Sequence, residues 1–330
     1  MIEIIETGPF NTVQDLGRPG YRKIGVTASG AMDPFGLKIG NVLVGNAPGA
    51  AAIEVQTFPF RLRFTGPVVF TVTGADCGAK LDEHPLLPWC THAADAGQAL
   101  ELGRPRTGAR AYLCFAGGLD VEPVMGSRST SLRGAFGGNG GRFLTATDRL
   151  ALCAETSGHR PRAGISVVDP AFALADHLPT SDDGSLIIRA LPAGEHDLFG
   201  NDAERFWTQI WQISSKSDRT GYRLSGEPVK PTTPVEMRSH GVVPGVIQVP
   251  PSGEPIVQMS DANTAGGYPK IAGVIDADLW RLGQARIGSR VRFVRATHRE
   301  ALDVEKAMTL FLDDVRVTCG MVTRALNTMA

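Results

Sequence analysis

The chain has 330 residues, of which 42% are hydrophobic and 20% are charged, and its formal net charge is −1. This balance gives no electrostatic reason to expect binding to nucleic acid or to an anionic membrane surface. The length exceeds that of one small core, so we expect two subdomains.

The composition favours a β protein. Glycine and proline, with 39 and 22 residues, occur along the whole chain, as expected when short strands are joined by tight turns. The sequence has no signal-peptide pattern and no apolar run of about 18 residues. The five cysteines include no CxxC pair, which argues against a disulfide framework and fits a reducing compartment. We therefore expect a cytoplasmic protein.

Short apolar or alternating runs predict the strands of the first half, at residues 2–5, 61–64, 68–73, 110–115 and 149–153. A helix is expected to begin after Asp33, because this N-cap residue and Pro34 precede an apolar face formed by Phe35, Ile39, Val42 and Leu43.

A stretch with many prolines and weak periodicity, residues 155–185, separates the two halves. We place the boundary near residue 180, which gives subdomains at 1–180 and 181–330. In the second half, strands are predicted at 186–191, 246–249, 256–259 and 290–294.

Two helices are predicted in the second half. Asn201 and Asp202 open the first, whose apolar stripe consists of Phe206, Trp207, Ile210 and Trp211. A capping box, Thr297 with Glu300, opens the second, which continues through Ala301, Val304, Met308 and Phe311. We expect both helices to pack against a core.

Polar segments with glycines mark the candidate binding site. The first, residues 12–34, contains Asp15, Arg18, Ser29, Met32 and Asp33, and the second, residues 126–130, contains Arg128 and Ser129. The third, residues 214–223, contains Asp218, Arg219 and Tyr222. Residues 15–21 and 218–222 share acid, Arg, Gly and Tyr in one order, which suggests an internal duplication.

The most distinctive segment is 258–272, which holds Asp261, Asn263, Thr264, Gly266, Gly267, Tyr268 and Lys270. Gly266 and Gly267 permit backbone geometries closed to other residues and let the main chain approach a ligand closely. The polar side chains around this bend could bind and orient a small polar molecule.

Several familiar chemistries have no motif in the chain. There is no GxxxxGK[ST] phosphate loop, no HExxH and no GxSxG, and the glycine cluster at 134–141 does not fit GxGxxG. Cys90, His92 and His84 could supply metal ligands, but a structural site needs four and no second cluster is evident. We therefore expect no metal.

Arg18, Arg128 and Arg219 each lie beside small or hydroxyl-bearing residues. A guanidinium binds a carboxylate through paired hydrogen bonds, so these arginines could hold a carboxylate or carbamate ligand. Pairing with Asp15, Asp33 and Asp218 to hold loops together is an equal alternative for any one of them.

The chain resembles the biotin-dependent carboxyltransferase family, also known as allophanate hydrolase subunit 2. The resemblance rests on ordered motifs between residues 8 and about 295: QDLGRPGY, GVTASGAMDP, NVLVGN, GGLDV, MGSRST, SDRTGYRL, IQVPPSG and GGYPKIA. It implies a mainly β fold of two related cyclophilin-like β-barrel subdomains with a few short helices. It also implies a partner of the allophanate hydrolase subunit 1 type.

The free-standing bacterial form of the family resembles the C subunit of an ATP-dependent 5-oxoprolinase. In that hetero-oligomer, ATP is hydrolysed while 5-oxo-L-proline is opened to L-glutamate, with a further subunit of the lactam-utilisation type. The implied alternative is carboxyl transfer to urea or a related amide from carboxybiotin, carried on a separate biotin carrier protein. Neither setting predicts a cofactor held tightly by this chain, and ATP is expected at the level of the complex.

One segment departs from the family pattern, which commonly reads Asp-x-Gln-Thr-Thr-Gly-Gly-Tyr-Pro. Here Asn263 replaces Gln and Ala265 replaces a hydroxyl-bearing residue. The departure leaves the substrate open.

The expected catalytic residues are Asp218, Asp261, Tyr268 and Lys270. Lys270 and Tyr268 would neutralise or orient developing negative charge, Asp261 or Asp218 would act as acid or base, and the arginines would clamp the carboxylate. The expected binding residues are Asp15, Arg18, Ser29, Met32, Asp33, Arg128, Ser129, Arg219, Tyr222, Asn263, Thr264, Gly266 and Gly267. A further alternative implied by the family is a non-enzymatic regulator that sequesters a kinase inhibitor.

Overall fold

The computed structural model describes residues 1–154 and 163–328, which form two compact units. Unit 1 comprises Met1–Arg18, Ser29–Ala173 and Thr309–Ala330, and unit 2 comprises Pro19–Ala28 and Leu174–Met308. The subdomain division at 1–180 and 181–330 stays a prediction, since a packing unit need not coincide with a subdomain. The start of the proline-rich stretch, residues 155–162, lies outside the described residues.

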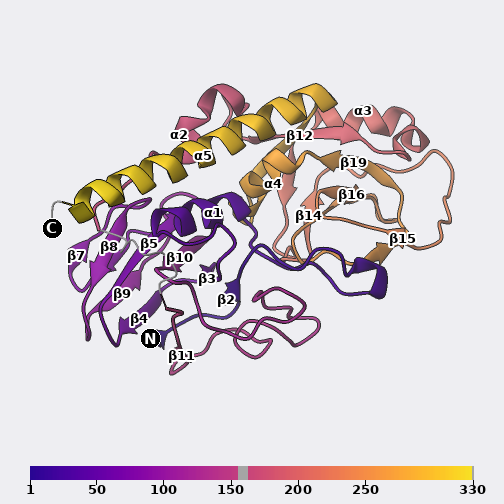
Figure 1. Cartoon of the computed structure of the whole chain (residues 1–330). Helices are drawn as coiled ribbons and strands as arrows, with labels where there is room; N and C mark the ends of the chain where they lie inside the picture. Colours follow the sequence, from indigo (N-terminus) through magenta and orange to yellow (C-terminus); the bar gives the residue numbers. More distant parts are fainter. Residues whose placement is uncertain (155–162, 329–330) are drawn as a thin grey trace. The chain divides into compact units, whose positions relative to one another are not determined.

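Unit 1 contains two open antiparallel sheets (Figure 1). The six-stranded sheet has the order β11-β1-β4-β9-β6-β7, with bounds Arg149–Leu150, Ile2–Glu6, Phe60–Phe64, Ala99–Leu102, Lys80–Leu81 and His84–Pro85. The five-stranded sheet has the order β2-β3-β10-β5-β8, with bounds Thr12–Gln14, Ala52–Val55, Ala111–Phe115, Val68–Gly74 and Thr91–Ala94.

The core of unit 1 follows from alternation along these strands. In β4, Phe60, Leu62 and Phe64 are buried, while the arginines between them are more exposed. Phe64 contacts Phe70 with ring centroids 5.0 Å apart. The strands predicted in the first half are confirmed, although the one expected at 149–153 extends only over Arg149–Leu150. In β1 and β4 the period of two placed the apolar side chains on one face.

Helix α1, Pro34–Leu43, begins where the sequence predicts. Asp33 is its N-cap, and Asp33 Oδ1 accepts a hydrogen bond from the Gly36 amide at 2.7 Å. The helix lies against the five-stranded sheet at Gly40, where an added Cβ would stand 2.7 Å from Cys114 Sγ. A glycine at this position therefore lets the helix approach the sheet.

Unit 2 is built around a closed seven-stranded barrel (Figure 1). Its order is β12-β19-β16-β17-β14-β13-β20, with bounds Leu186–Pro192, Lys270–Val274, Val246–Gln248, Ile256–Gln258, Gly221–Ser225, Trp211–Ile213 and Arg290–Arg295. β12 and β20 run parallel, and the other neighbours in the barrel are antiparallel. In a separate pair, β15 (His240–Gly241) and β18 (Ala265–Gly266), the second strand is part of the segment 258–272, called the glycine segment below.

The prediction of a mainly β fold is confirmed in part, since the described residues form a mixed α/β fold with more strand than helix. Two closed barrels were expected, but the described residues close one, in unit 2. In unit 1 the two sheets keep open edges, because no ladder between them appears among the described strands.

The described helices are α1, α2 (Pro170–Ala173), α3 (Asn201–Thr208), α4 (Asp276–Gly283) and α5 (His298–Thr328), with 3-10 turns at Arg22–Ile24, Ala175–His177 and His196–Phe199. None of the helices described has both the length and the apolarity needed to span a bilayer.

Two details of the helix prediction are wrong. Ile210 and Trp211 were expected in the stripe of the helix at 201, but α3 ends at Thr208 because Gln209 is extended, and Trp211 begins β13. Helices were expected to be short, but α5 has 31 residues. Its capping box is as predicted, with the Glu300 amide 3.2 Å from Thr297 Oγ1. The buried face then continues past Phe311 through Val315 and Cys319.

Candidate functional site

In unit 1, Asp15 ties the end of β2 to the loop that carries Arg128 and Ser129. Its Oδ1 accepts hydrogen bonds from Ser127 Oγ at 2.6 Å and from Ser129 Oγ, and its Oδ2 accepts one from the Arg128 amide at 2.6 Å. Because both carboxylate oxygens are engaged by the chain, Asp15 holds the loop in place.

Arg18 is buried in the same cluster, with 1% of its surface exposed. Its guanidinium donates to the carbonyls of Val124 and Ser129 and lies 5.0 Å from the ring centroid of Phe136. Arg128 Nε donates to the Val121 carbonyl at 2.7 Å. The structure therefore brings Asp15, Arg18, Arg128 and Ser129 together, with Arg18 enclosed by backbone and an aromatic ring.

Ser29, Met32 and Asp33 are also buried. The loop that holds them is fixed by Glu54, whose Oε2 accepts from the Met32 amide at 2.8 Å and from Tyr112 Oη at 2.7 Å. Tyr112 Oη in turn accepts from the Asp33 amide at 2.7 Å. Burial, followed by the charge of Glu54, raises the pKa of the Tyr112 phenol, so this group stays protonated and donates to Glu54.

Replacing Tyr112 by phenylalanine should lower the free energy of unfolding by about 1–3 kcal/mol, because it removes one hydrogen bond from the buried Glu54 carboxylate and one from the Asp33 amide. Chemical denaturation measures the change. Tyr268→Phe is the matched control, since Tyr268 is 44% exposed. Equal stability of the Tyr112→Phe and control variants would show that the network contributes nothing.

In unit 2, two residues with separately predicted roles pair with each other. Arg219 Nε donates to Asp261 Oδ2 at 2.9 Å, and Arg219 Nη2 reaches Asp261 Oδ1 at 3.4 Å. The Asp261 amide also donates to the Arg219 carbonyl at 2.9 Å. This pair joins the 214–223 segment to the start of the glycine segment.

Asp218 closes a turn, and Tyr222 is buried within a strand. Asp218 Oδ1 accepts from the amides of Thr220 and Gly221 at 2.7 and 3.1 Å, which closes the turn before β14. Tyr222 lies within β14 and is 2% exposed.

Lys270 and Tyr268 remain accessible. Lys270 Nζ lies 3.8 Å from Glu195 Oε1, and both side chains are about one fifth exposed. The Lys270 amide also donates to Glu195 Oε2 at 3.2 Å. The partly exposed ammonium of Lys270 therefore lies beside a carboxylate that no sequence motif indicated.

The glycines of the segment 258–272 serve close packing. An added Cβ at Gly266 would lie 2.7 Å from Gln248 Nε2, and one at Gly267 would lie 3.0 Å from the Met237 carbonyl oxygen. Neither glycine has a positive φ. Their need for a small residue thus comes from neighbouring protein atoms.

Arg22 is a site residue that the sequence did not reveal. Its Nη1 donates to the Val242 carbonyl at 2.5 Å and to the Asn263 carbonyl at 3.2 Å. The Val242 amide donates to the Thr264 carbonyl at 3.1 Å, beside the β15–β18 pair. Arg22 therefore links the two strands of this ladder at one end.

Burial lowers the pKa of Arg22 from its usual value. Its Nη2 is buried and has no hydrogen-bond partner in the part of the chain that the structure describes. The only feature of the sequence that pointed to Arg22 was its position in the polar segment 12–34. Other residues of that segment were of types more typical of a binding site.

Arg22→Ala should loosen the glycine segment, because it removes a charged donor from the carbonyls of Val242 and Asn263. We expect faster amide exchange at residues 263–266 and a loss of about 1.5–3 kcal/mol in the free energy of unfolding. Hydrogen exchange by mass spectrometry measures the first effect. The neighbouring exposed Lys23, replaced by Ala, is the control, and unchanged exchange in Arg22→Ala would contradict the linking role.

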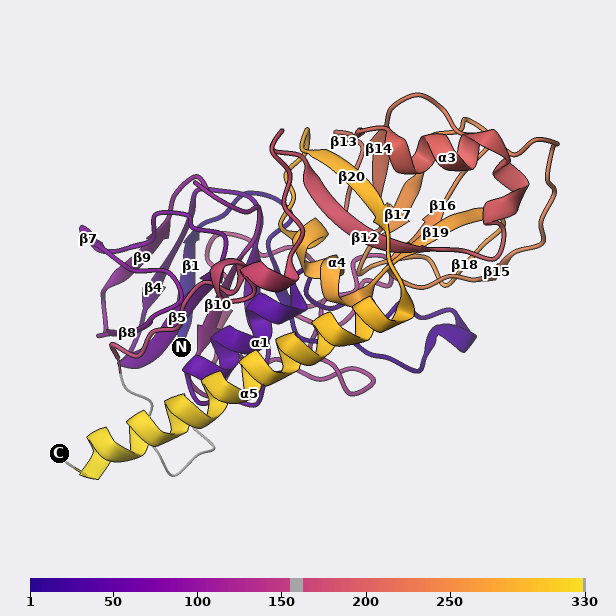
Figure 2. The ribbon, with the colours of Figure 1, turned by 90° about the horizontal axis from the view of Figure 1, so that it is seen from above.

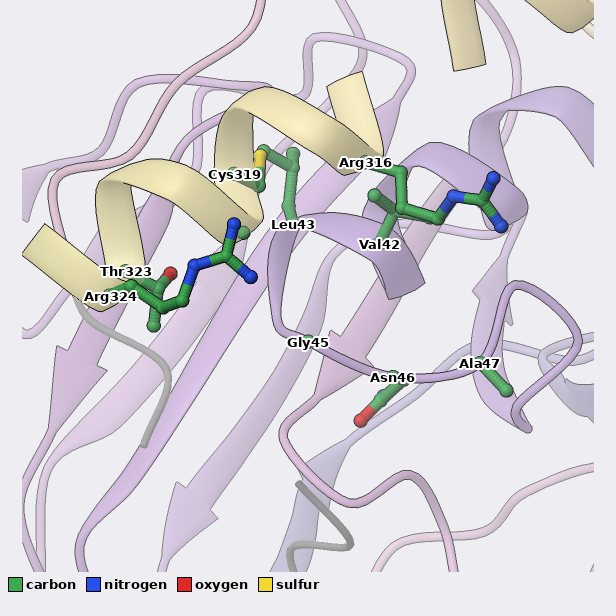
Figure 3. Close-up of a pocket in the computed structure, with 10 residues that line it drawn as sticks. Val42, Leu43, Gly45, Asn46, Ala47, Arg316, Cys319, Thr323 and Arg324 are labelled. Carbon is green, nitrogen blue, oxygen red and sulfur yellow. The ribbon is translucent and has the colours of Figure 1, made fainter. Parts of the chain in front are cut away.

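No group of three or more His, Cys, Asp or Glu side chains suited to a metal ion occurs in the residues described. His92 Nε2 instead lies 2.9 Å from the Leu87 carbonyl oxygen. A pocket of about 330 Å³ lies in unit 1 between the end of α1 and the last turns of α5 (Figure 3). It is lined by Leu43, Asn46, Arg316, Cys319 and Arg324 among others, and by none of the predicted site residues.

Comparison with known proteins matches residues 24–295 to the family described as carboxyltransferase domain, subdomain A and B. The chain is 40% identical over 316 residues to the 5-oxoprolinase C subunit of Escherichia coli K12, covering 96% of this chain and 97% of that one. It is 39% identical over 317 residues to the 5-oxoprolinase C subunit of Haemophilus influenzae, covering 96% and 98%. The crystal structure of Kluyveromyces lactis urea carboxylase is similar with a TM-score of 0.85 and 28% identity, covering 95% of this chain and 29% of that chain.

Proposed function

The chain belongs to the carboxyltransferase domain family, subdomains A and B, and from this membership we propose that it is the C subunit of a 5-oxoprolinase. The observation that carries the proposal is 40% identity to a protein of that name along nearly the full length of both chains. The complex would open 5-oxo-L-proline to L-glutamate while ATP is hydrolysed.

We place this chain in a hetero-oligomer with subunits of the allophanate hydrolase subunit 1 and lactam-utilisation types, and ATP at the level of that complex. We place the complex in the cytosol. All five cysteines are free thiols, which suits a reducing compartment.

Opening the lactam breaks its amide C–N bond. The carbonyl carbon gains the oxygen of a water molecule, the nitrogen leaves with a proton from that water, and negative charge develops on the carbonyl oxygen before the C–N bond breaks. A cation near that oxygen lowers the barrier. Lys270 suits this role, because its ammonium is partly exposed at the start of β19.

Glu195 suits proton transfer at the same place, because its carboxylate lies 3.8 Å from the Lys270 ammonium. The half-exposed phenol of Tyr268, two residues before Lys270, would orient the substrate. Arg22 and the Arg219–Asp261 pair would hold in place the glycine segment, which contains Tyr268 and Lys270.

Carboxyl transfer to urea is the second candidate, and the similarity to urea carboxylase favours it. In that case Lys270 would bind the transferred carboxylate, and biotin would come from a carrier protein.

Co-expression with the partner subunits separates these functions. We expect ATP-dependent release of glutamate from 5-oxoproline, and no bicarbonate-dependent carboxylation of urea when a biotinylated carrier is added. The reverse pattern would replace the first function by the second. Loss of both activities, with tight partner binding retained, would favour a regulatory protein.

A further inference from the structure

The C-terminal half of α5 carries an apolar stripe on its outer face. Leu310, Val317 and Met321 are 55%, 49% and 58% exposed. The opposite face packs on unit 1, where Phe311 contacts Phe35 with ring centroids 6.1 Å apart and Cys319 is buried. Figures 1 and 2 both show this half of α5 beside α1. Large apolar side chains are thus exposed on the outer face of a helix whose inner face packs on unit 1 at Phe311 and Cys319.

The spacing of the stripe is that of a helix-pairing seam. Leu310, Asp314, Val317, Met321 and Arg324 follow one another at intervals of four, three, four and three residues, which is the heptad pattern. The residues that flank the middle of the seam, Thr318 and Gly320, are small and allow close approach of a second helix.

The two charged members of the seam identify the second helix. When two copies of α5 pack antiparallel about a midpoint between Val317 and Met321, Val317 meets Met321 of the second copy. Asp314 then meets Arg324 of the second copy, and the same contact occurs twice by symmetry. Parallel packing would place Asp314 on Asp314 and Arg324 on Arg324, which is repulsive.

Both charges are available for this contact. Neither Asp314 nor Arg324 makes a side-chain hydrogen bond or ion pair with any other described residue, whereas Arg316 donates to Asp313 at 2.8 Å. Arg324 stands at the pocket between α1 and α5, where Cys319 and Leu43 point toward one another (Figure 3). The last turns of α5 therefore lie over a hollow and are incompletely packed by their own unit.

We propose that this chain forms a twofold dimer through antiparallel pairing of the outer faces of α5, with Val317–Met321 contacts at the centre and Asp314–Arg324 ion pairs on either side. The occupant of the stripe is a second copy of this chain. The seam is short, so we expect a weak dimer. The proposal is independent of the proposed enzymatic function.

Sedimentation velocity of the full chain over a range of concentrations tests the dimer. Asp314→Arg and Arg324→Asp each convert two attractive contacts into repulsive ones, and each should raise the dimer dissociation constant by roughly tenfold. The double variant carrying both changes restores the contacts and should return the constant to within about threefold of the parent. Val317→Asp should leave only monomer.

Arg316→Gln, on the flank of the helix, is the control and should leave the constant unchanged. Circular dichroism establishes that each variant is folded. A chain that is monomeric at every concentration, or a double variant no better than the single ones, would overturn the proposal. A monomeric chain that loses its partner subunits on Val317→Asp would assign the stripe to a different protein and equally overturn it.

Discussion

Replacing Asp278 by alanine should lower the free energy of unfolding by about 3–5 kcal/mol, the largest stability effect expected in unit 2. Asp278 is fully buried on α4. Its Oδ2 accepts from the Arg189 amide and Nε at 2.8 and 3.0 Å, and its Oδ1 accepts from Arg189 Nη2 at 2.6 Å. The carboxylate thus joins α4 to β12.

The size of the effect comes from the charges left behind. Without Asp278, two guanidinium groups with little exposure, those of Arg189 and Arg281, would face each other uncompensated. Burial already lowers the pKa of Arg281. Urea denaturation followed by tryptophan fluorescence measures the change, since Trp207 and Trp211 lie in unit 2.

Asp303→Ala is the control for Asp278→Ala. It removes an exposed pair, Arg299–Asp303 at 3.0 Å, and should cost less than about 1 kcal/mol. An Asp278→Ala variant no less stable than this control would contradict the assignment.

Replacing Lys270 by methionine should lower the turnover number of the assembled complex by roughly 10²–10³-fold, with a small effect on stability. Methionine keeps the length of the side chain and removes its charge. The Lys270–Glu195 pair is partly exposed, so its loss alone should cost less than about 1 kcal/mol. Steady-state rates of ATP-dependent glutamate formation measure the effect.

Two variants make the Lys270 experiment specific. Lys216→Met changes an exposed lysine of the same unit and should leave turnover unchanged. Glu195→Gln keeps the shape of the neighbour but removes its charge, and it should lower turnover and alter the pH dependence of the rate. Full turnover of the Lys270→Met complex would exclude the ammonium from the chemistry.

The sequence predicted those parts of the fold that local patterns determine. Strands such as β4 follow from alternation of large apolar residues with arginines, and the starts of α1 and α5 follow from their capping residues. The predicted family is confirmed, because ordered motifs along the chain are more specific than any single motif.

Features that depend on distant partners could not be read from the sequence. Arg22 binds carbonyls more than 200 residues away, and Glu195 meets Lys270 across 75 residues. No local pattern signals such a contact. Arg219 and Asp261 were given separate roles for the same reason, since their pairing spans 42 residues. The length of α5 was missed because its buried face beyond Phe311 is marked only by Val315 and Cys319.

The central claim is that this chain is a required subunit of a 5-oxoprolinase, and an omission experiment tests it most directly. Glutamate released from 5-oxoproline and ATP is measured with the purified partner subunits alone and after this chain is added. We predict no glutamate release without this chain. With added chain, release should rise until the chain and its partner subunits are present in equal amounts. Full release by the partner subunits alone would contradict the claim.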